Sequence, residues 1–261
     1  MLRFTIATVT YNAGATIQRT LQSVFSQTHE AVEHLIIDGC STDGTMAAIH
    51  RYVEQNTDLR HPHNICLVRE PDQGLYDAMN KAIQQARGDY IVFLNAGDCF
   101  HSPTVLADVA AQLDARYNPA RLPAVVYGET DLVDGEGRFV RHRRLQAPER
   151  LSAKSFLSGM LVCHQSFYVR TDIARTELYD LRFRFSADYD WCIRVLRRAE
   201  RRELARHNTH LILTDYLSEG MTTRNHRRSL VERLRLMAHH YGWGRALAAH
   251  AWFVVRAVIL R

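Results

Sequence analysis

The chain has 261 residues, of which 46% are hydrophobic and 23% are charged. This composition fits a folded globular protein and leaves little room for long disordered tracts. Lys and Arg number 33 against 28 Asp and Glu, which gives a formal net charge of +5. Because a nucleic-acid-binding protein would carry a denser basic stripe, this balance argues against nucleic acid and favours anionic ligands such as phosphates or lipid headgroups.

Five cysteines are widely spaced, and no two of them form a CxxC pair. This pattern argues against a disulfide framework and a zinc knuckle, and it favours a reducing compartment. The first residues, MLRFTIATVTYNAG, lack the apolar run and cleavage site of a secretory signal and predict a strand instead. We therefore expect the protein in the cytoplasm.

Short β-branched or apolar runs alternate with amphipathic stretches over the first 115 residues. The runs predict strands at 4–9, 34–37, 65–68 and 90–94, and the stretches predict helices at 15–26, 42–54 and 76–86, with a fourth helix after Pro103. This alternation is typical of an α/β protein in which helices cover both faces of a mostly parallel sheet.

The pattern changes after about residue 120 and becomes α+β in character. Residues 124–134 and 137–144 predict a hairpin, residues 161–170 a further strand, and residues 186–200 a helix. No Pro, Gly or Ser-rich linker separates the two halves, so we expect one continuous domain.

The C-terminal segment, 243–260, has about the length of a membrane span. Arg245, His250 and Arg256 interrupt it, which argues against a transbilayer helix and favours an interfacial or packed one. The basic stretch at 224–240 could lie against anionic lipid, or it could be an ordinary solvated helix face.

In an open parallel sheet, ligands bind beyond the carboxyl ends of the strands. Polar residues follow each of the first four predicted strands: Thr10, Tyr11 and Asn12; Asp38, Ser41 and Asp43; Glu70, Asp72 and Gln73; Asn95 and Asp98. The chain has neither a GxGxxG fingerprint nor a GxxxxGK[ST] loop to cradle phosphates. A divalent cation held by Asp98 would let such an acidic rim accept a nucleoside diphosphate.

Four segments in register carry a resemblance to a known family. TVTYNAG, IIDGCSTDGT, EPDQGLYDAMNKAI and GDYIVFLNAGDCF resemble the family 2 glycosyltransferases of the GT-A fold, more narrowly the bacterial enzymes of exopolysaccharide, colanic-acid-type and O-antigen assembly. HQSFYV, SADYDW and SEGMTT extend the resemblance to about residue 223. It implies a Rossmann-like, mostly parallel sheet with flanking helices.

The resemblance also implies an organisation of the chain. Residues 1–223 would form the GT-A domain, with a nucleotide-sugar-binding half at 1–115 and an acceptor half at 116–223. Residues 224–261 would form a basic, amphipathic helical segment.

Substrate and metal roles follow from the resemblance. Thr8, Tyr11 and Asp38 correspond to residues that hold the base and ribose. The metal-binding DxD element falls on residues 95–98, where only Asp98 keeps its carboxylate, so Asp98 is the expected ligand for Mn²⁺ or Mg²⁺ and Asn95 is left to hydrogen-bond ribose.

Two histidines, His101 and His164, could supplement the metal coordination, or they could be structural. His164 and Gln165 look suited to the acceptor side. The segment 218–224 could close over bound nucleotide, with Arg224, Arg227 or Arg228 meeting phosphate; a turn before a basic helix would have the same sequence.

The predicted helix at 76–86 carries polar residues on one face. Asp77, Asn80 and Lys81 lie three and four residues apart and could grip the sugar and pyrophosphate. The alternative is an Asp77–Lys81 pair across one helical turn, which needs no ligand.

The SADYDW motif resembles the acidic motif at which inverting members carry the catalytic base. Asp188 is therefore the expected base, and Asp190 a supporting substrate-binding residue. The alternative is that a carboxylate merely caps the start of a helix.

These observations predict an inverting, metal-dependent glycosyltransferase. It would move a sugar from a nucleoside-diphosphate sugar to a hydroxyl of a glycan or of a polyprenyl-diphosphate-linked acceptor in surface polysaccharide assembly, at the inner face of the cell membrane. The alternatives are a non-catalytic, membrane-associated nucleotide-sugar-binding or assembly protein, a nucleotidyltransferase, and a retaining transferase.

Overall fold

A computed structural model describes residues 1–58, 60–218 and 226–259 of the chain. The strands are β1 (Phe4–Thr10), β2 (Val32–Asp38), β3 (Asn64–Arg69), β4 (Tyr90–Phe93), β5 (Cys99–Phe100), β6 (Val125–Val133), β7 (Phe139–His142), β8 (Phe167–Arg170) and β9 (Arg206–Leu217). The helices are α1 (Ile17–Phe25), α2 (Thr45–Asn56), α3 (Leu75–Gln85), α4 (Val105–Arg116), α5 (Thr171–Ala174), α6 (Ala187–Arg201), α8 (His226–Tyr241) and α9 (Trp243–Ile259). Three short 3₁₀ segments are η1 (Pro119–Arg121), η2 (Ala153–Ser158) and η3 (His164–Ser166).

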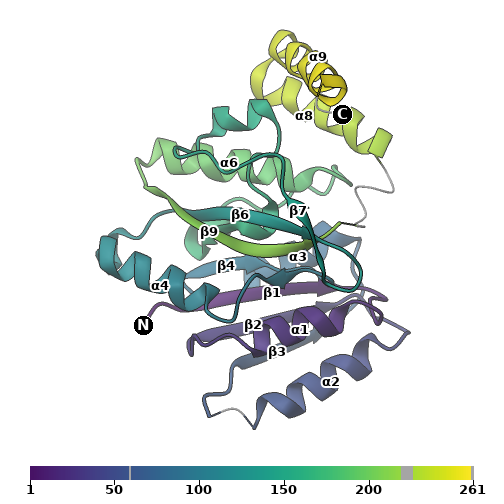
Figure 1. Ribbon diagram of the computed structural model, residues 1–261, viewed down its shortest axis with the longest axis vertical. Coiled ribbons are helices and arrows are strands. Elements are labelled where there is room, and N and C mark those ends of the chain that lie inside the picture. The colour runs from purple at the N-terminus through teal and green to yellow at the C-terminus, as the bar shows by residue number, and fades with distance from the viewer. Residues whose placement is uncertain (59, 219–225, 260–261) are drawn as a thin grey trace.

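One sheet runs through both halves of the chain, in the order β3-β2-β1-β4-β8-β6-β9-β5, with β7 paired to β6 (Figure 1). The pairs of β1 with β2, β1 with β4 and β2 with β3 are parallel. Every residue of β1 and β2 is buried, because helices cover both faces of this part of the sheet. The predicted α/β architecture with a mostly parallel first half is confirmed.

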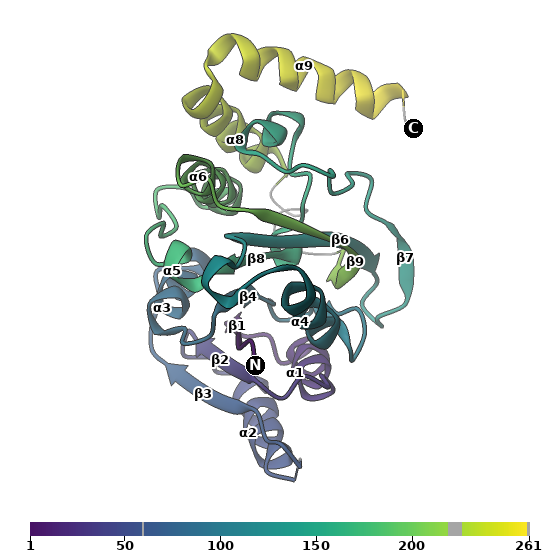
Figure 2. The ribbon, with the colours of Figure 1, turned by 90° about the vertical axis from the view of Figure 1, so that its left-hand side faces the viewer.

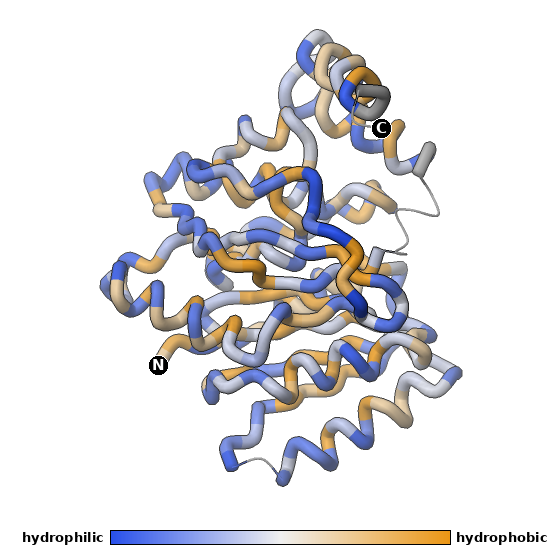
Figure 3. Tube along the Cα trace, in the orientation of Figure 1, coloured by the Kyte–Doolittle hydropathy of each residue, from blue (hydrophilic) through white to orange (hydrophobic). Residues whose placement is uncertain are grey.

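Two layers of helices enclose the sheet. Apolar residues of α3 and α6 pack on one face in the largest core cluster, whereas α1 and α4 pack on the other face and α2 packs against α1. Hydrophobic residues accordingly concentrate along the central strands, and hydrophilic residues lie along the outer helices (Figure 3). The packing leaves the carboxyl ends of β1 and β4 open at one edge of the sheet.

The second half extends the same sheet with antiparallel strands. β8 pairs with both β4 and β6, and β6 forms the predicted hairpin with β7. The strand predicted at 161–170 is wrong in its first part, because residues 164–166 form η3 and only Phe167–Arg170 are extended. β9 was not predicted, since its polar and charged residues hide the strand pattern in the sequence, yet it runs parallel to β6 over most of its length.

The C-terminal helices stack on α6 and away from the parallel strands. The α8 residue His240 accepts a hydrogen bond from Arg197 of α6 through its carbonyl oxygen at 2.6 Å. α9 turns back over α8 and lies at one end of the molecule (Figure 2). Within the described parts of the chain, no helix combines the length and the apolar character that crossing a membrane requires.

Candidate active site

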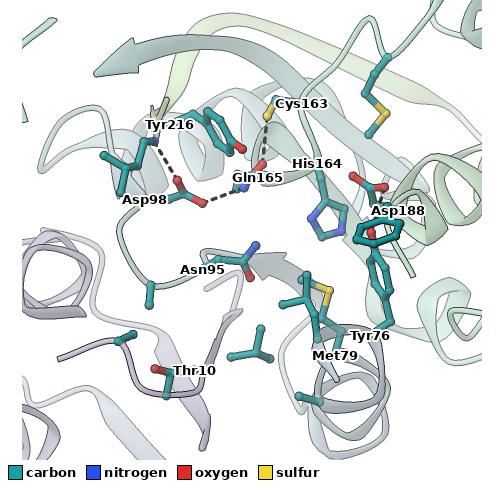
Figure 4. Close-up of a pocket in the computed structure, with 18 of the residues that line it drawn as sticks. Thr10, Tyr76, Met79, Asn95, Asp98, Cys163, His164, Gln165, Asp188 and Tyr216 are labelled. Atoms are coloured by element: carbon teal, nitrogen blue, oxygen red, sulfur yellow. Dashed lines mark hydrogen bonds between the residues drawn. The ribbon is translucent and has the colours of Figure 1, made fainter. Parts of the chain in front are cut away.

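A cavity of about 840 Å³ opens beyond the carboxyl ends of β1 and β4 (Figure 4). Thr10 and Tyr11 line it from the end of β1, and Asn95, Ala96 and Asp98 line it after β4. The opposite walls come from the start of α3, the β6–β7 hairpin, η3, the end of β9, the start of α6 and α8. This is the edge of the sheet at which the sequence predicts a ligand.

Asp98 is a buried carboxylate at one side of this cavity, with only 4% of the residue exposed. One oxygen accepts from the backbone N–H of Leu217 at 3.0 Å, and the other from Nε2 of Gln165 at 2.7 Å. Burial raises the pKa of Asp98 to about 7, because these two neutral donors offset the cost of burying the charge only in part.

The surroundings of Asp98 fit a divalent cation. The cation would supply the counter-charge that the buried carboxylate lacks, and Mg²⁺ and Mn²⁺ prefer oxygen ligands. The side-chain oxygen of Asn95, which also lines the cavity, is buried and has no hydrogen-bond partner among the described residues. An unsatisfied amide oxygen of this kind can accept from a ligand hydroxyl or bind a cation.

Asp188 lies on the other side of the cavity, in the first turn of α6 (Figure 4). Its Oδ1 accepts from the hydroxyl of Tyr76 at 3.2 Å and from its neighbour's backbone N–H, that of Tyr189, at 2.9 Å. Tyr76 stacks on Tyr179, which in turn stacks on the fully buried Trp191, with ring centroids 5.4 and 4.8 Å apart. A rigid aromatic stack thus fixes the hydroxyl that orients Asp188.

His164 lines the cavity between the two carboxylates as a buried, neutral side chain. Its ring stacks on Phe93, and its Nε2 is hydrogen-bonded to the hydroxyl of Tyr179. Burial lowers the pKa of His164 to about 4, so the ring is uncharged at neutral pH. The side-chain amide of the neighbouring Gln165 donates a hydrogen bond to Asp98, whereas the sequence predicts a place on the acceptor side.

Tyr11 stands at the mouth of the cavity with 65% of its surface exposed. The turn after it is tied to the turn after β2, because Asn12 accepts from the backbone N–H of Thr42 at 2.9 Å. Gly39 lets the side chain of Asp72, another lining residue, approach this corner closely, because a Cβ at residue 39 would lie 2.4 Å from a carboxylate oxygen of Asp72.

Two residues expected to hold the base and ribose lie outside the cavity lining. Thr8 is fully buried in β1, where its hydroxyl donates to the carbonyl of Leu94 at 2.9 Å. Asp38 is also fully buried, and its carboxylate accepts from the backbone N–H and the hydroxyl of Ser41. In this structure these side chains are bonded within the sheet and the turn after β2, and their contact with the base and ribose stays a prediction.

The polar face of α3 also lies outside the cavity lining. Lys81 forms ion pairs with Glu70 at 3.1 Å and Asp77 at 3.7 Å, as the ligand-free alternative predicted. The side-chain amide of Asn80 makes two hydrogen bonds to the backbone of Tyr179, at 2.7 and 3.0 Å. Asp77, Asn80 and Lys81 therefore have partners within the fold, and their role as substrate contacts stays a prediction.

Asp190 points away from the cavity, into the junction between α6 and α8. Its carboxylate pairs with Arg194 and with His240, each at 2.7 Å. Burial alone would raise the pKa of Asp190, but the hydrogen bonds from His240 and Arg194 outweigh it and lower the pKa. Asp190 is thus a structural residue, because residues two apart on a helix face different directions.

A second set of possible metal ligands, His101, Asp131 and Asp215, lies across β5, β9 and β6. Neighbouring side chains on a strand face opposite ways, and Leu132 and Tyr216 line the cavity. Asp131 and Asp215 therefore face away from it. His101 is hydrogen-bonded to Asp215 at 2.8 Å and does not supplement Asp98.

Five arginines line the cavity and were not predicted: Arg141, Arg143, Arg144, Arg184 and Arg233. The basic run at 141–144 in the predicted hairpin was the available signal in the sequence. The segment 218–224, including Arg224, lies outside the described residues except for Ser218.

Comparison with known proteins places the chain among glycosyltransferases. A sequence model described as "Glycosyl transferase family 2" matches residues 5–177. An uncharacterized glycosyltransferase of Mycobacterium tuberculosis (strain H37Rv) is 32% identical over 193 residues, which cover 73% of this chain and 67% of that protein. A PGL/p-HBAD biosynthesis glycosyltransferase of Mycobacterium bovis (strain BCG) is 30% identical over 192 residues, which cover 73% of this chain and 68% of that protein.

Solved structures with the same arrangement confirm the predicted GT-A fold. S. aureus TarS 1–349 in complex with UDP-GlcNAc superposes with a TM-score of 0.68 at 17% identity, over 91% of this chain and 66% of that one. The mannosyltransferase PcManGT from Pyrobaculum calidifontis, in complex with GDP-Man and Mn²⁺, superposes with a TM-score of 0.62 at 18% identity, over 97% of this chain and 75% of that one.

Proposed function

Since the chain belongs to glycosyl transferase family 2 and is a glycosyltransferase, we propose that it transfers a sugar from a nucleoside-diphosphate sugar to an acceptor hydroxyl with inversion at the anomeric carbon. The observation that carries this proposal is the pairing of Asp98 and Asp188 across one cavity of about 840 Å³. A cavity of that size can hold a nucleotide sugar together with part of an acceptor.

The donor side of the cavity is the edge formed by β1 and β4. Structural neighbours bind UDP-GlcNAc and GDP-Man, so the donor class here is a nucleoside-diphosphate sugar. Tyr11 offers an exposed aromatic face for the base. Asn95 offers its unpaired amide oxygen to a ribose hydroxyl.

Asp98 would hold a divalent metal, Mn²⁺ or Mg²⁺. Asn95, three residues earlier in the chain, lines the same cavity. When bound, the metal neutralises charge that develops on the departing diphosphate. A structural neighbour in complex with Mn²⁺ supports this choice. Asp98 is suited to this role because burial destabilises its negative charge, and a bound cation would stabilise that charge.

Asp188 acts as the general base. Its carboxylate accepts the proton of the acceptor hydroxyl while that oxygen forms a bond to the anomeric carbon and the bond to the diphosphate oxygen breaks. The electron pair leaves with the nucleoside diphosphate, which needs no acid to protonate it. Attack from the face opposite the leaving group inverts the configuration, and the hydroxyl of Tyr76 keeps Asp188 aimed at the acceptor.

Residues 1–115 would form the donor half of the catalytic unit and residues 116–223 the acceptor half. The acceptor class is a glycan or a polyprenyl-diphosphate-linked saccharide used in surface polysaccharide assembly. Residues 224–261 would bring the enzyme to the inner face of the cell membrane.

The C-terminal residues support this membrane contact. The outward side chains of α9 include Trp243, Leu247, Trp252 and Val254, which are 61, 54, 57 and 66% exposed. No acidic residue follows Glu232 in the sequence, whereas five arginines do. Exposed apolar side chains on a helix among positive charges are what binds an anionic membrane surface.

A panel of nucleotide sugars tests the function. In the presence of Mn²⁺, the protein should hydrolyse or transfer from at least one donor, and Asp188→Asn should lower turnover by about 10² to 10⁴ while the nucleotide still binds. Asp180→Asn is the matched control, because Asp180 precedes α6 and pairs with Arg182 on the surface. Unchanged turnover in Asp188→Asn would contradict the assignment of the base, and NMR of the product would report retention if the stereochemistry is wrong.

A further inference from the structure

Arginines without carboxylate partners gather in the cavity. Among the five lining arginines, Arg143 already has acceptors within the fold, because it donates to the carbonyls of Leu161 at 2.9 Å and of Met160. In the described parts of the chain, Arg144, Arg184 and Arg233 form no ion pair with a carboxylate. Several arginines elsewhere do: Arg170 with Asp172, Arg182 with Asp180, and Arg194 with Asp190 and Glu177.

Arg184 and Arg233 are held at the same end of the cavity as Asp188. The carboxylate of Glu232 accepts from three consecutive backbone N–H groups, those of residues 184, 185 and 186, at 3.0, 2.8 and 2.7 Å. This anchors the segment that carries Arg184 to the helix that carries Arg233. The carboxylate next to Arg233 in the sequence is thus occupied by backbone donors.

Arg233 has an unused donor. Its guanidinium lies 5.7 Å from the ring centre of Tyr189, which directly follows Asp188. Its Nε is buried and has no hydrogen-bond partner among the described residues. A buried guanidinium N–H without an acceptor is costly, and a ligand oxygen would remove that cost.

The position of these arginines assigns them to the acceptor. A base must touch the hydroxyl that it deprotonates, so groups beside Asp188, in the segment before α6 and on α8, meet the acceptor. The donor diphosphate belongs with Asp98 at the other side of the cavity (Figure 4). Guanidinium groups bind phosphate oxygens through paired hydrogen bonds, more specifically than a point charge does.

We propose that the acceptor carries a phosphate group, which Arg184 and Arg233 bind beside Asp188, with Arg144 on the facing hairpin. This inference rests on the proposed function and specifies the substrate class of the same site.

An apolar wall adjoins the arginines and fits an alkyl chain next to the phosphate. Leu145, Met160 and Phe185 line this part of the cavity. A Cβ on Gly159 would lie 3.4 Å from Leu145 and 3.8 Å from Phe253 of α9, so the wall continues to the C-terminal helix. A lipid phosphate and the phosphate ester of a soluble sugar both carry the phosphate that the arginines would bind. The experiment below distinguishes these two classes of acceptor.

The test uses octyl phosphate as a probe, titrated calorimetrically into the full chain saturated with Mn²⁺ and with UDP or GDP, whichever the chain binds, so that the donor site is filled. Octyl phosphate should bind the wild type, and Arg184→Ala and Arg233→Ala should each weaken it about tenfold or more. Arg182→Ala is the control, because Arg182 lies two residues from Arg184 but pairs with Asp180 on the surface. Arg184→Lys and Arg233→Lys keep the charge and should recover part of the affinity.

Two comparison ligands complete the test. Octyl glucoside, which lacks phosphate, should not compete with the probe. Glycerol phosphate binding as tightly as octyl phosphate would support a soluble phosphate ester, and much weaker binding would support a lipid-linked one; either outcome keeps the phosphate.

Three results would overturn the inference: no binding of octyl phosphate, an equal loss in Arg182→Ala, or weaker binding of that nucleotide in the Arg184 and Arg233 variants, which would assign them to the donor. Hydrolysis of the nucleotide sugar, measured in parallel, separates the two proposals. If hydrolysis occurs but octyl phosphate does not bind, the enzyme function stands and the phosphate acceptor does not. If the protein neither hydrolyses nor transfers from any nucleotide sugar of the panel, the enzyme function itself is contradicted.

Discussion

A single buried carboxylate, that of Asp98, determines how the empty site responds to pH. Its pKa is about 7 in the folded protein and near 3.8 when exposed, so the folded state holds a proton that the unfolded state loses. This contribution to stability is fully present below pH 3.8 and is lost as the pH rises through 7. At pH 8 the protein without metal therefore bears the full cost of a buried negative charge.

Asp98→Asn should consequently stabilise the metal-free protein at pH 8 by roughly 2 kcal/mol and have a much smaller effect at pH 5. Thermal unfolding with a chelator at both pH values measures this difference. Mn²⁺ should raise the melting temperature of the wild type at pH 8 and leave that of Asp98→Asn unchanged. Equal stabilisation of both proteins by Mn²⁺ would show that the metal binds elsewhere.

Between elements, Asn80 joins α3 to the segment that leads into α6. Its side-chain amide both donates to and accepts from the backbone of Tyr179. Asn80→Ala should leave two buried backbone groups unsatisfied and lower the free energy of unfolding by about 2 to 3 kcal/mol. Chemical denaturation measures the loss.

Asn95→Ala is the matched comparison for this prediction. Because the amide oxygen of Asn95 has no partner in the described structure, its removal should change stability by less than about 0.5 kcal/mol and weaken nucleotide-sugar binding instead. If Asn80→Ala instead lowered the affinity for the donor without lowering stability, Asn80 would be a substrate contact and not a structural residue.

Helices and strands with a clear apolar periodicity were predictable from the sequence, whereas the hydrogen-bond partners of individual side chains were not. The strands β1 to β4 and the helices α1 to α3 follow from apolar runs and helical spacing, whereas β9 is hidden by residues such as Arg206, Asn208 and His210. The motif positions Asp98 and Asp188 do line the cavity. Asp38 does not, because a sequence cannot tell that Ser41 folds back to occupy its carboxylate.

For the molecule as a whole, the proposed membrane contact of the C-terminal helices can be tested directly. Vesicles containing anionic phospholipid should co-sediment the full chain, and replacing Trp243 and Trp252 together with Ser should reduce the bound fraction about fivefold or more. Raised salt and purely zwitterionic vesicles should each weaken binding, because part of the attraction is electrostatic. Trp191→Phe is unsuitable as a control, since Trp191 is fully buried, so Phe139→Ser on the exposed hairpin serves instead.

The cavity walls come from segments that lie far apart in sequence, which explains why the lining arginines were not predicted. Arg144, Arg184 and Arg233 come from a hairpin, a loop and a helix that lie far apart in sequence. Their meeting depends on β6, β8 and β9 joining the parallel strands in one sheet, which short-range patterns do not encode.

The anchoring of residues 184–186 by Glu232 has a practical consequence for fragments of this chain. The stretch matched by the family ends at residue 177, before the segment that Glu232 secures. A fragment trimmed to that stretch would lose the proposed base Asp188 with Arg184 and Arg233, and it would also lose Leu217, whose backbone N–H donates to Asp98. Expression boundaries drawn from the family match alone would thus remove part of the cavity wall, and sequence surveys limited to that stretch would omit Arg184 and Arg233 of the proposed acceptor site.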